Sequence, residues 1–381
     1  MGDRPARILT IAGSDSGGGA GIQADIKTIT MLGGHAMTAI TAITAQNSRG
    51  VDAVQVLDTE MVIAQIDAVA RDFGLDAIKI GMLGSPAIAE ALADWLTAQG
   101  QIPVVFDPVM IASSGAVLAD PATIAAFRRL MGCATLVTPN LPELGALGGE
   151  AAVLELAPAV LIKGGHAPGE TVTDRLVNRA GETARWDDPR IHSPHAHGTG
   201  CTLSSAIATL LGQGVPLEQA VERARLFVRL ALRDAPRLVE ANGPMGHQNV
   251  RNDAVGAGLH LNQITLGATD YAASVTFYRA IGLLQIVDSP DNGYARFEAD
   301  NGATLSIHVG EGAGGAMAYL ECADLDARVS ALASEGFAFD QMPQDESWGW
   351  REARLCDPAG NVLCLYFGGE NRRYPPWRMD R

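Results

Sequence analysis

The sequence predicts an α/β protein: a mostly parallel sheet with helices on both faces, followed by a smaller α+β domain of two βαβββ units. Over residues 1–250, short β-rich runs alternate with helical segments, and each run ends in a polar or glycine turn. Such alternation is typical of parallel sheets covered by helices. A second observation is a strand and helix pattern that occurs twice between residues 259 and 370, which indicates an internal duplication.

The length of 381 residues favours more than one domain. We expect a first domain at 1–250 and a second at 259–370. The stretch 251–258 is polar and contains glycine, as linkers do, and 371–381 is expected to form a C-terminal tail.

The elements of the first domain follow from apolar runs and their turns. A β-rich run at 8–12 ends in a glycine loop and is followed by a helical segment at 22–32. Further strands are predicted at 36–45, 77–80, 104–106, 135–138 and 160–163, and further helices at 61–72, 87–99 and 217–235. The arginines of the last helix, Arg223, Arg225, Arg229 and Arg233, are interpreted as a solvated face.

Composition narrows the class of partner. The net charge is −15 and neither domain has a basic face, which argues against nucleic acids and anionic membranes. The five cysteines form no CxxC pair, no apolar run reaches membrane length, and the N-terminus carries no signal-peptide pattern. We therefore expect a reduced, cytoplasmic protein that acts on a small molecule.

The most informative stretch is His197-Gly-Thr-Gly-Cys201, which runs directly into an apolar, alanine-rich helix. Such a helix start offers free backbone N–H groups and the positive end of the helix dipole, so it binds anions. Cys201 lies in the first turn, where the dipole is expected to lower the pKa of its thiol. The alternative interpretation is a glycine cap with a small buried cysteine.

Polar residues follow several predicted strands. Asp107 comes directly after one strand, and Asn140 and Glu143 follow the next. The carboxyl ends of parallel strands meet at one edge of a sheet, so these side chains are expected to converge near the helix start at 199. Two carboxylates beside a phosphate site suit Mg²⁺. Taken singly, the same residues read as turn and helix-cap residues.

Seven motifs in order resemble one family over about residues 6–247. They are the stretches 11–25, 45–50, 79–82, 107–110, 138–143, 162–166 and 197–201. These stretches resemble the hydroxymethylpyrimidine/phosphomethylpyrimidine kinases of thiamine biosynthesis, which have the ribokinase-like fold. The resemblance implies ATP-dependent phosphorylation of 4-amino-5-hydroxymethyl-2-methylpyrimidine and then of its monophosphate, with ATP and Mg²⁺ as cofactors, in a homodimer.

The resemblance also implies roles for individual residues. The pyrimidine pocket falls on Gly13, Asp25, Gln46, Met82 and Val109. By the same resemblance, Asp107 and Glu143 would bind Mg²⁺, and Asn140, Lys163 and Thr199 would bind the nucleotide. The backbone of Gly198, Thr199 and Gly200 would form the anion hole. Lys163 and Cys201 would be the catalytic residues, with Cys201 as a candidate base. Pyridoxal kinase activity and a non-catalytic sensor of thiamine precursors are the alternatives. The segment 144–158 is shorter than in the family, which usually has another helix there.

The second domain resembles the vicinal-oxygen-chelate superfamily of glyoxalases, dioxygenases and antibiotic-resistance proteins, by its stretches 270–282, 324–327 and 357–361. Its first unit is predicted as strands at 259–268, 286–287, 294–298 and 304–309 with a helix at 271–281. Its second unit is predicted as strands at 318–322, 337–339, 351–356 and 362–367 with a helix at 325–335.

In metal-using members of that superfamily, four side chains in a cupped sheet hold a divalent ion. Their positions fall here on Gln263, Ser306, Met317 and Cys364, with His308 as a possible substitute for Ser306. No common metal suits that set. We therefore expect a metal-free domain that binds a small organic ligand in a cup lined by Tyr294, Trp348, Trp350 and Tyr366, with a dioxygenase- or glyoxalase-like enzyme as the alternative.

Overall fold

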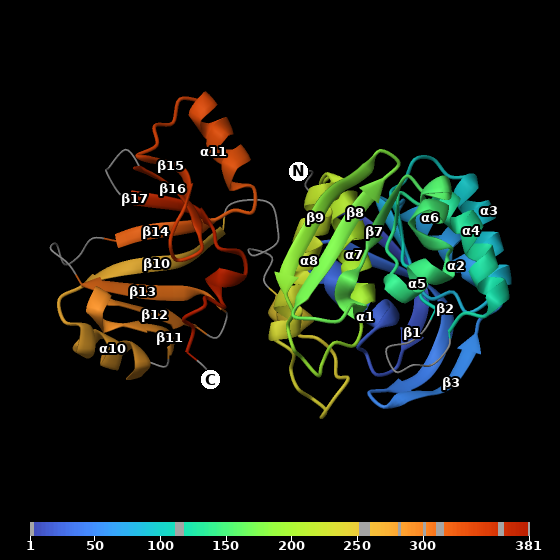
Figure 1. Ribbon diagram of the computed structural model, residues 1–381, viewed down its shortest axis with the longest axis horizontal. Coiled ribbons are helices and arrows are strands. Elements are labelled where there is room, and N and C mark those ends of the chain that lie inside the picture. The colour runs from blue at the N-terminus through green and yellow to red at the C-terminus, as the bar shows by residue number, and fades with distance from the viewer. Residues whose placement is uncertain are drawn as a thin grey trace. The chain divides into compact units, whose positions relative to one another are not determined.

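The computed structural model describes residues 4–110, 118–250, 260–280, 283–299, 302–309, 316–356 and 362–379 (Figure 1). The chain divides into two compact units, Met1–Val250 and Arg251–Arg381. The predicted linker at 251–258 lies outside the described residues. Each unit has its own sheet.

The first unit is built on a sheet of nine strands: β1 (Arg7–Asp15), β2 (His35–Asn47), β3 (Gly50–Val56), β4 (Ala77–Ile80), β5 (Val104–Phe106), β6 (Leu136–Val137), β7 (Ala159–Ile162), β8 (Thr171–Asn178) and β9 (Gly181–Pro189). Their order in the sheet is β3-β2-β1-β4-β5-β6-β7-β8-β9. The pairs between β2 and β7 are parallel, whereas β3, β8 and β9 join antiparallel. Every residue of β4 and β5 is buried, as expected for parallel strands covered on both faces. The predicted mostly parallel sheet is confirmed.

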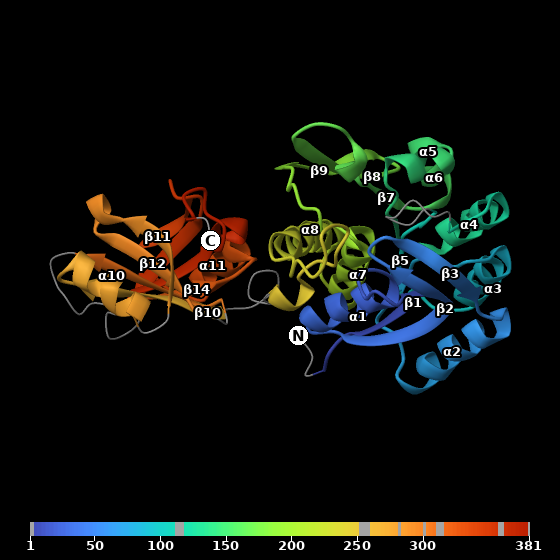
Figure 2. The same ribbon diagram turned by 90° about the horizontal axis from the view of Figure 1, so that it is seen from below.

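Helices cover both faces of this sheet (Figure 2). One face carries α1 (Gly21–Met31), α7 (Thr199–Gly212) and α8 (Leu217–Arg233). The other carries α2 (Thr59–Asp72), α3 (Pro86–Thr97) and α4 (Pro121–Cys133). The main core lies between the sheet and this second set, around residues such as Ile80, Leu92, Phe106 and Phe127.

Some elements of the first unit were not predicted. Strands β3 and β9 have mostly exposed or half-buried residues and no apolar run, so their sequences carry little strand signal. The short segment 144–158 does contain a helix. After α5 (Leu141–Ala146), it forms α6 (Gly149–Leu156), which buries Val153 in the core.

The second unit has an eight-stranded sheet and two helices among its described residues. Its first repeat is β10 (His260–Ala268), α10 (Tyr271–Ala280), β11 (Leu284–Ser289), β12 (Tyr294–Glu298) and β13 (Thr304–Val309). Its second is β14 (Ala316–Glu321), α11 (Leu325–Ser334), β15 (Gln341–Asp345), β16 (Arg351–Cys356) and β17 (Val362–Phe367). The strand order is β11-β12-β13-β10-β14-β17-β16-β15, so the two predicted βαβββ units lie on either side of the β10–β14 pair.

Two predictions for the second unit need correction. The strand expected at 337–339 is wrong: Phe337 is exposed, and the strand is the polar edge β15 instead. The described part of the predicted tail packs against the unit, since Arg372 is 1% exposed and its Nε lies 3.1 Å from Oε2 of Glu321. In the part of the chain that the structure describes, no helix is both long and apolar enough to span a membrane.

Candidate active site

A pocket of about 930 Å³ opens in the first unit at the carboxyl ends of the parallel strands. Every site residue predicted there lines it, except Asp25. Asp107 follows β5, Asn140 follows β6 and Lys163 follows β7, and backbone hydrogen bonds from Asp107 N to Ile80 O and from Lys163 N to Pro139 O continue the sheet to this edge. The expected convergence of polar strand ends is therefore present.

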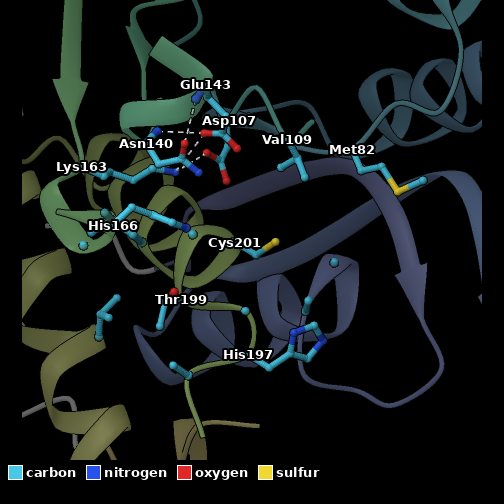
Figure 3. A pocket seen from close by; sticks show the side chains of 18 of the residues that line it. Met82, Asp107, Val109, Asn140, Glu143, Lys163, His166, His197, Thr199 and Cys201 are labelled. Atoms are coloured by element: carbon cyan, nitrogen blue, oxygen red, sulfur yellow. Dashed lines mark hydrogen bonds and ion pairs between the residues drawn. The ribbon is translucent and has the colours of Figure 1, made fainter. Parts of the chain in front are cut away.

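One side of the pocket carries a cluster of charges (Figure 3). Lys163 Nζ donates to Asp107 Oδ1 at 2.7 Å and lies 4.0 Å from Glu143 Oε2. Burial opposes the charge on Lys163, but Asp107 and Glu143 outweigh it and raise the pKa of the lysine. Burial, opposed by Lys163 and aided by Asp107, raises the pKa of Glu143 to about 7. The cluster thus holds a fixed cation beside two carboxyl groups.

Asn140 and Glu143 also form the capping box of α5. Asn140 Oδ1 accepts from Glu143 N at 2.9 Å, and Glu143 Oε2 accepts from Asn140 N at 2.8 Å. The cap interpretation and the site interpretation therefore both apply, because the box holds the Glu143 carboxyl at the pocket wall.

The start of α7 lies beside this cluster. Gly198 has φ +87°, and a Cβ there would lie 1.9 Å from Gly19 O, so only glycine fits where the two glycine loops touch. A Cβ on Gly200 would lie 3.3 Å from Asp107 Oδ2 and 3.4 Å from Lys163 Nζ. No side chain caps this helix, so N–H groups at its start can face an anion; Thr199 N already has a long hydrogen bond of 3.4 Å to Ala196 O.

Cys201 lies at this helix start, between the charge cluster and His197 in Figure 3, but its acidity differs from the prediction. Burial raises the pKa of its thiol to about 11; Lys79 lowers it, and Asp25 and Asp107 raise it further. The expected lowering by the helix dipole is wrong because desolvation of the thiolate outweighs it. The thiol is protonated at neutral pH.

Asp25 does not reach the pocket. It is fully buried, and its carboxylate accepts from Lys79 Nζ at 2.8 and 3.0 Å, from Ser205 Oγ at 2.6 Å and from Thr10 Oγ1. Lys79 is also fully buried. The pair joins α1, β4 and α7 beneath the site. The prediction that Asp25 contacts the substrate is therefore wrong, and Asp25 is a structural ion-pair partner of Lys79.

The other end of the pocket is less charged. It is lined by Gly13, Met82, Val109, Gln46 and His197. A Cβ on Gly13 would lie 2.9 Å from Met82 Sδ, so glycine leaves room for that side chain. This end combines apolar walls with one amide, one imidazole and the carboxylate of Asp15.

Sequence reasoning missed several pocket residues. Arg225 was read as solvated, but it is 7% exposed and pairs with Asp174 at 2.7 Å and Asp188 at 2.5 Å. Its partners lie on β8 and β9, neither of which was predicted from the sequence. Arg225, Arg190 and Arg229 all line the pocket.

In the second unit, three of the four positions implied as metal ligands hydrogen-bond to one another or to other side chains, and the fourth, Met317, packs against the apolar cluster around Trp350. Gln263 Nε2 donates to Ser306 Oγ at 3.1 Å, and Thr304 Oγ1 donates to Gln263 Oε1 at 3.1 Å. The Cys364 thiol is buried and donates to Glu352 Oε2 at 3.5 Å, and burial raises its pKa. His308 is exposed.

Two of the aromatic residues expected to line the cup are closed off. The rings of Trp350 and Tyr366 stack with centroids 4.4 Å apart, and the guanidinium carbon of Arg296 lies 4.4 Å from the centroid of a Trp350 ring. Trp350 is 3% exposed and Tyr366 is 0% exposed, so neither ring is open to a ligand, and the prediction that they line a ligand cup is wrong. Tyr294 and Trp348 remain half-buried.

Comparison with known proteins identifies the first unit. Residues 15–246 match the family model described as phosphomethylpyrimidine kinase. The chain belongs to the phosphomethylpyrimidine kinase family. Residues 260–365 match the model of the Glyoxalase/Bleomycin resistance protein/Dioxygenase superfamily.

Similar proteins cover mainly the first unit. The hydroxymethylpyrimidine/phosphomethylpyrimidine kinase of Rhizobium meliloti is 46% identical over 260 residues, covering 64% of this chain and 97% of that protein. A thiamine biosynthesis bifunctional protein of Geobacter sulfurreducens is 44% identical over 254 residues, covering 63% of this chain; the match spans about half of that protein, 52%.

Solved structures of two kinds resemble the same unit. The phosphomethylpyrimidine kinase of Clostridium difficile has TM-score 0.52 and 38% identity, covering 59% of this chain and 98% of that one. The ADP complex of Bacillus subtilis pyridoxal kinase has TM-score 0.58 and 33% identity, covering 64% and 98%.

The buried ion pair beneath the site gives a stability prediction. Lys79→Met leaves the Asp25 carboxylate buried without a cation, so it should lower the free energy of unfolding by about 3–5 kcal/mol. Adding Asp25→Asn to Lys79→Met should recover much of that loss, as measured by urea unfolding. Arg129→Met, which removes an exposed ion pair, is the control and should change stability little. Equal stability of the single and double variants would contradict the role assigned to the pair.

Proposed function

We propose that the first unit transfers the γ-phosphoryl group of ATP to the hydroxymethyl group of 4-amino-5-hydroxymethyl-2-methylpyrimidine, and then phosphorylates the resulting monophosphate. The observation that carries the proposal is a single pocket whose two ends differ in chemistry. Apolar walls and an amide at Gly13, Gln46, Met82 and Val109 suit an aminopyrimidine. The cation and the uncapped helix start at the other end suit phosphates.

The end of the pocket with the charge cluster carries the residues suited to phosphoryl transfer. Asp107 and Glu143 offer hard carboxylate oxygens, and Mg²⁺ uses one or two of these together with waters and phosphate oxygens, so these residues fit that ion. Bound there, Mg²⁺ would neutralise charge on the nucleotide phosphates. Lys163 and the N–H groups of Gly198, Thr199 and Gly200 would hold the transferring group, and Asn140 borders the nucleotide.

Cys201 takes a smaller part than a catalytic base. A thiol with a pKa of about 11 is protonated at neutral pH and cannot then accept the hydroxyl proton. Phosphoryl transfer through a loose transition state depends mainly on positioning and charge neutralisation. We assign to Cys201 a neutral thiol beside the reacting hydroxyl, together with its backbone N–H at the helix start.

Pyridoxal kinase activity is the second candidate. It is favoured by the similarity to the Bacillus subtilis enzyme and to a pyridoxal kinase from Staphylococcus aureus in complex with pyridoxal, which has TM-score 0.58 and 31% identity. A non-catalytic sensor would need none of the charge cluster around Lys163. The homodimer and the cytoplasmic location expected from the sequence stay predictions.

A coupled assay of ADP release tests the function. Hydroxymethylpyrimidine, its monophosphate and pyridoxal are compared side by side. Both pyrimidines should be turned over, each with a larger kcat/KM than pyridoxal. No turnover of either pyrimidine would reject the proposal, and turnover of pyridoxal alone would establish the second candidate.

The division of roles in the pocket predicts different losses for two variants. Lys163→Met should lower kcat by about 10²–10³-fold, because it removes a fixed positive charge at the transferring phosphoryl group, and should leave the KM for the pyrimidine nearly unchanged. Cys201→Ala retains the backbone N–H and should lower kcat by less than about tenfold. A loss for Cys201→Ala as large as that for Lys163→Met would instead assign the thiol as the base.

For the second unit we propose a site for a small organic ligand without a catalytic metal. The amide of Gln263, the hydroxyl of Ser306, the thioether of Met317 and a protonated Cys364 do not fit a divalent cation, and two of them already bond each other. Tyr294, Ser306 and Arg296 form a hydrogen-bonded row, at 2.9 Å from Tyr294 Oη to Ser306 Oγ and 3.1 Å from Arg296 Nε to Tyr294 Oη. Such a row suits a polar heterocycle better than a bare ion.

Metal analysis and calorimetry of the full chain check this proposal. After dialysis we expect well under one equivalent of Ni, Fe or Zn per chain, and titration with the hydroxymethylpyrimidine should reveal a second binding event beyond that of the kinase pocket. One tightly held equivalent of any of these metals would contradict the metal-free site and favour a dioxygenase- or glyoxalase-like enzyme.

A further inference from the structure

The imidazole of His197 joins the two loops that border the pyrimidine end of the pocket. Its Nε2 lies 3.0 Å from Asp15 Oδ2 on the first glycine loop and 3.2 Å from the terminal amide of Gln46 at the end of β2. The side chain is 10% exposed, and a Cβ on Gly19 would lie 2.4 Å from its Cδ2. The ring is therefore held against the backbone, and its Nε2 serves two neighbours at once.

Asp15 determines where the proton of His197 lies. Its carboxylate accepts from the N–H groups of Gly17, Gly19 and Ala20 at 2.8, 3.0 and 2.8 Å. Burial opposes ionisation, but hydrogen bonds from His197 and these N–H groups outweigh it and lower the pKa of Asp15. An ionised carboxylate only accepts hydrogen bonds, so Nε2 of His197 must carry a hydrogen and donate it.

Thr44 imposes an independent condition on the other end of the Gln46 amide. Its hydroxyl lies 2.8 Å from Ser14 O and 3.2 Å from the Gln46 amide. A hydroxyl has one hydrogen, and the Ser14 carbonyl can only accept, so that hydrogen is used on Ser14. Toward Gln46 the Thr44 oxygen can then only accept, which requires the NH₂ group of the amide.

The two conditions select the same orientation of Gln46. The oxygen and nitrogen of an amide exchange places by a half-turn, so their partners decide the assignment. Oε1 must face the Nε2–H of His197, which shares its single hydrogen between Asp15 Oδ2 and this oxygen, and Nε2 must face the hydroxyl of Thr44. This is the half-turned form of the amide in the structure, where Nε2 lies 3.2 Å from His197 Nε2 and Oε1 lies 3.2 Å from Thr44 Oγ1. The amide then has one lone pair on Oε1 and one N–H on Nε2 without a protein partner, and the orientation of the amide fixes where each lies. Gln46 lines the pocket, so both groups can serve a ligand there.

We propose that His197 is a positioning residue that fixes the Gln46 amide so that the pocket reads the adjacent ring nitrogen and amino group of an aminopyrimidine. This inference rests on the proposed kinase function of the pocket. A 4-aminopyrimidine offers an acceptor next to a donor, and a fixed amide offers a donor next to an acceptor. Pyridoxal lacks the amino group, so a fixed amide selects against it, whereas an amide free to turn does not.

A double-variant kinetic cycle tests the proposal, with ADP release measured for the wild type, His197→Phe, Gln46→Ala and the double variant. His197→Phe keeps the ring volume but removes the donor. It should raise the KM for hydroxymethylpyrimidine about tenfold, change kcat and the KM for ATP less than threefold, and reduce the preference for the pyrimidine over pyridoxal. In the Gln46→Ala background the same substitution should have almost no further effect on that KM, because the two residues act through one amide.

Three further variants keep the test decisive if His197→Phe does not fold. Thr44→Val removes the acceptor at the other end of the amide and should also raise the pyrimidine KM severalfold with kcat retained, while Thr44→Ser should restore it. His197→Gln, which retains an N–H donor, should recover part of the wild-type KM.

Four results separate the possible failures. Additive effects of His197→Phe and Gln46→Ala, or a fall in kcat with the pyrimidine KM unchanged, would overturn the positioning role. An unchanged pyrimidine KM in Thr44→Val would overturn it as well. If the wild type itself turns over neither pyrimidine, the proposed kinase function is wrong, and the proposed recognition of an aminopyrimidine by Gln46 is wrong with it.

Discussion

The pocket depends on the close approach of two glycine loops. With Gly198 in the left-handed region and the Gly19 carbonyl where a Cβ would otherwise be, the start of α7 rests directly on the loop after β1. This contact brings the helix N–H groups to the strand ends that carry Asp107 and Lys163. It also brings His197 to Asp15, so one backbone contact positions both the phosphate end and the pyrimidine end.

Local charges, not the net charge, make this site suitable for an anion. The chain carries a net charge of −15, yet Lys163 is fixed beside Asp107 and an uncapped helix start adds N–H groups. Beneath them, the buried pair of Lys79 and Asp25 ties α1, β4 and α7 together without exposing either charge. The low-dielectric surroundings that strengthen these interactions also keep the Cys201 thiol protonated.

The sequence predicted what depends on local patterns and on the rule that parallel strands end at one edge. The convergence of Asp107, Asn140 and Glu143 beside the helix start at 199 was foreseen for that reason, whereas Lys163 was assigned through the family resemblance. Asp25 was misplaced because its partners, Lys79 and Ser205, lie 54 and 180 residues away, and the sequence does not say which side of α1 faces them. The burial of Arg225 and the desolvation of the half-buried Cys201 likewise come from tertiary packing. The edge strands β3, β9 and β15 lack apolar runs. The link from Asp15 through His197 to Gln46 connects three separate motifs and becomes visible only when they are folded together.

A crystal structure of the chain with hydroxymethylpyrimidine and a non-hydrolysable ATP analogue tests the central claim most directly, because it shows where both ligands lie in the single pocket. We predict that the pyrimidine lies against Met82 and Val109 with its amino group at Gln46, and that the terminal phosphate lies at the N–H groups of Gly198–Gly200 beside Lys163. A pyrimidine bound near Arg190 and Arg229, or a terminal phosphate remote from the start of α7, would contradict the account.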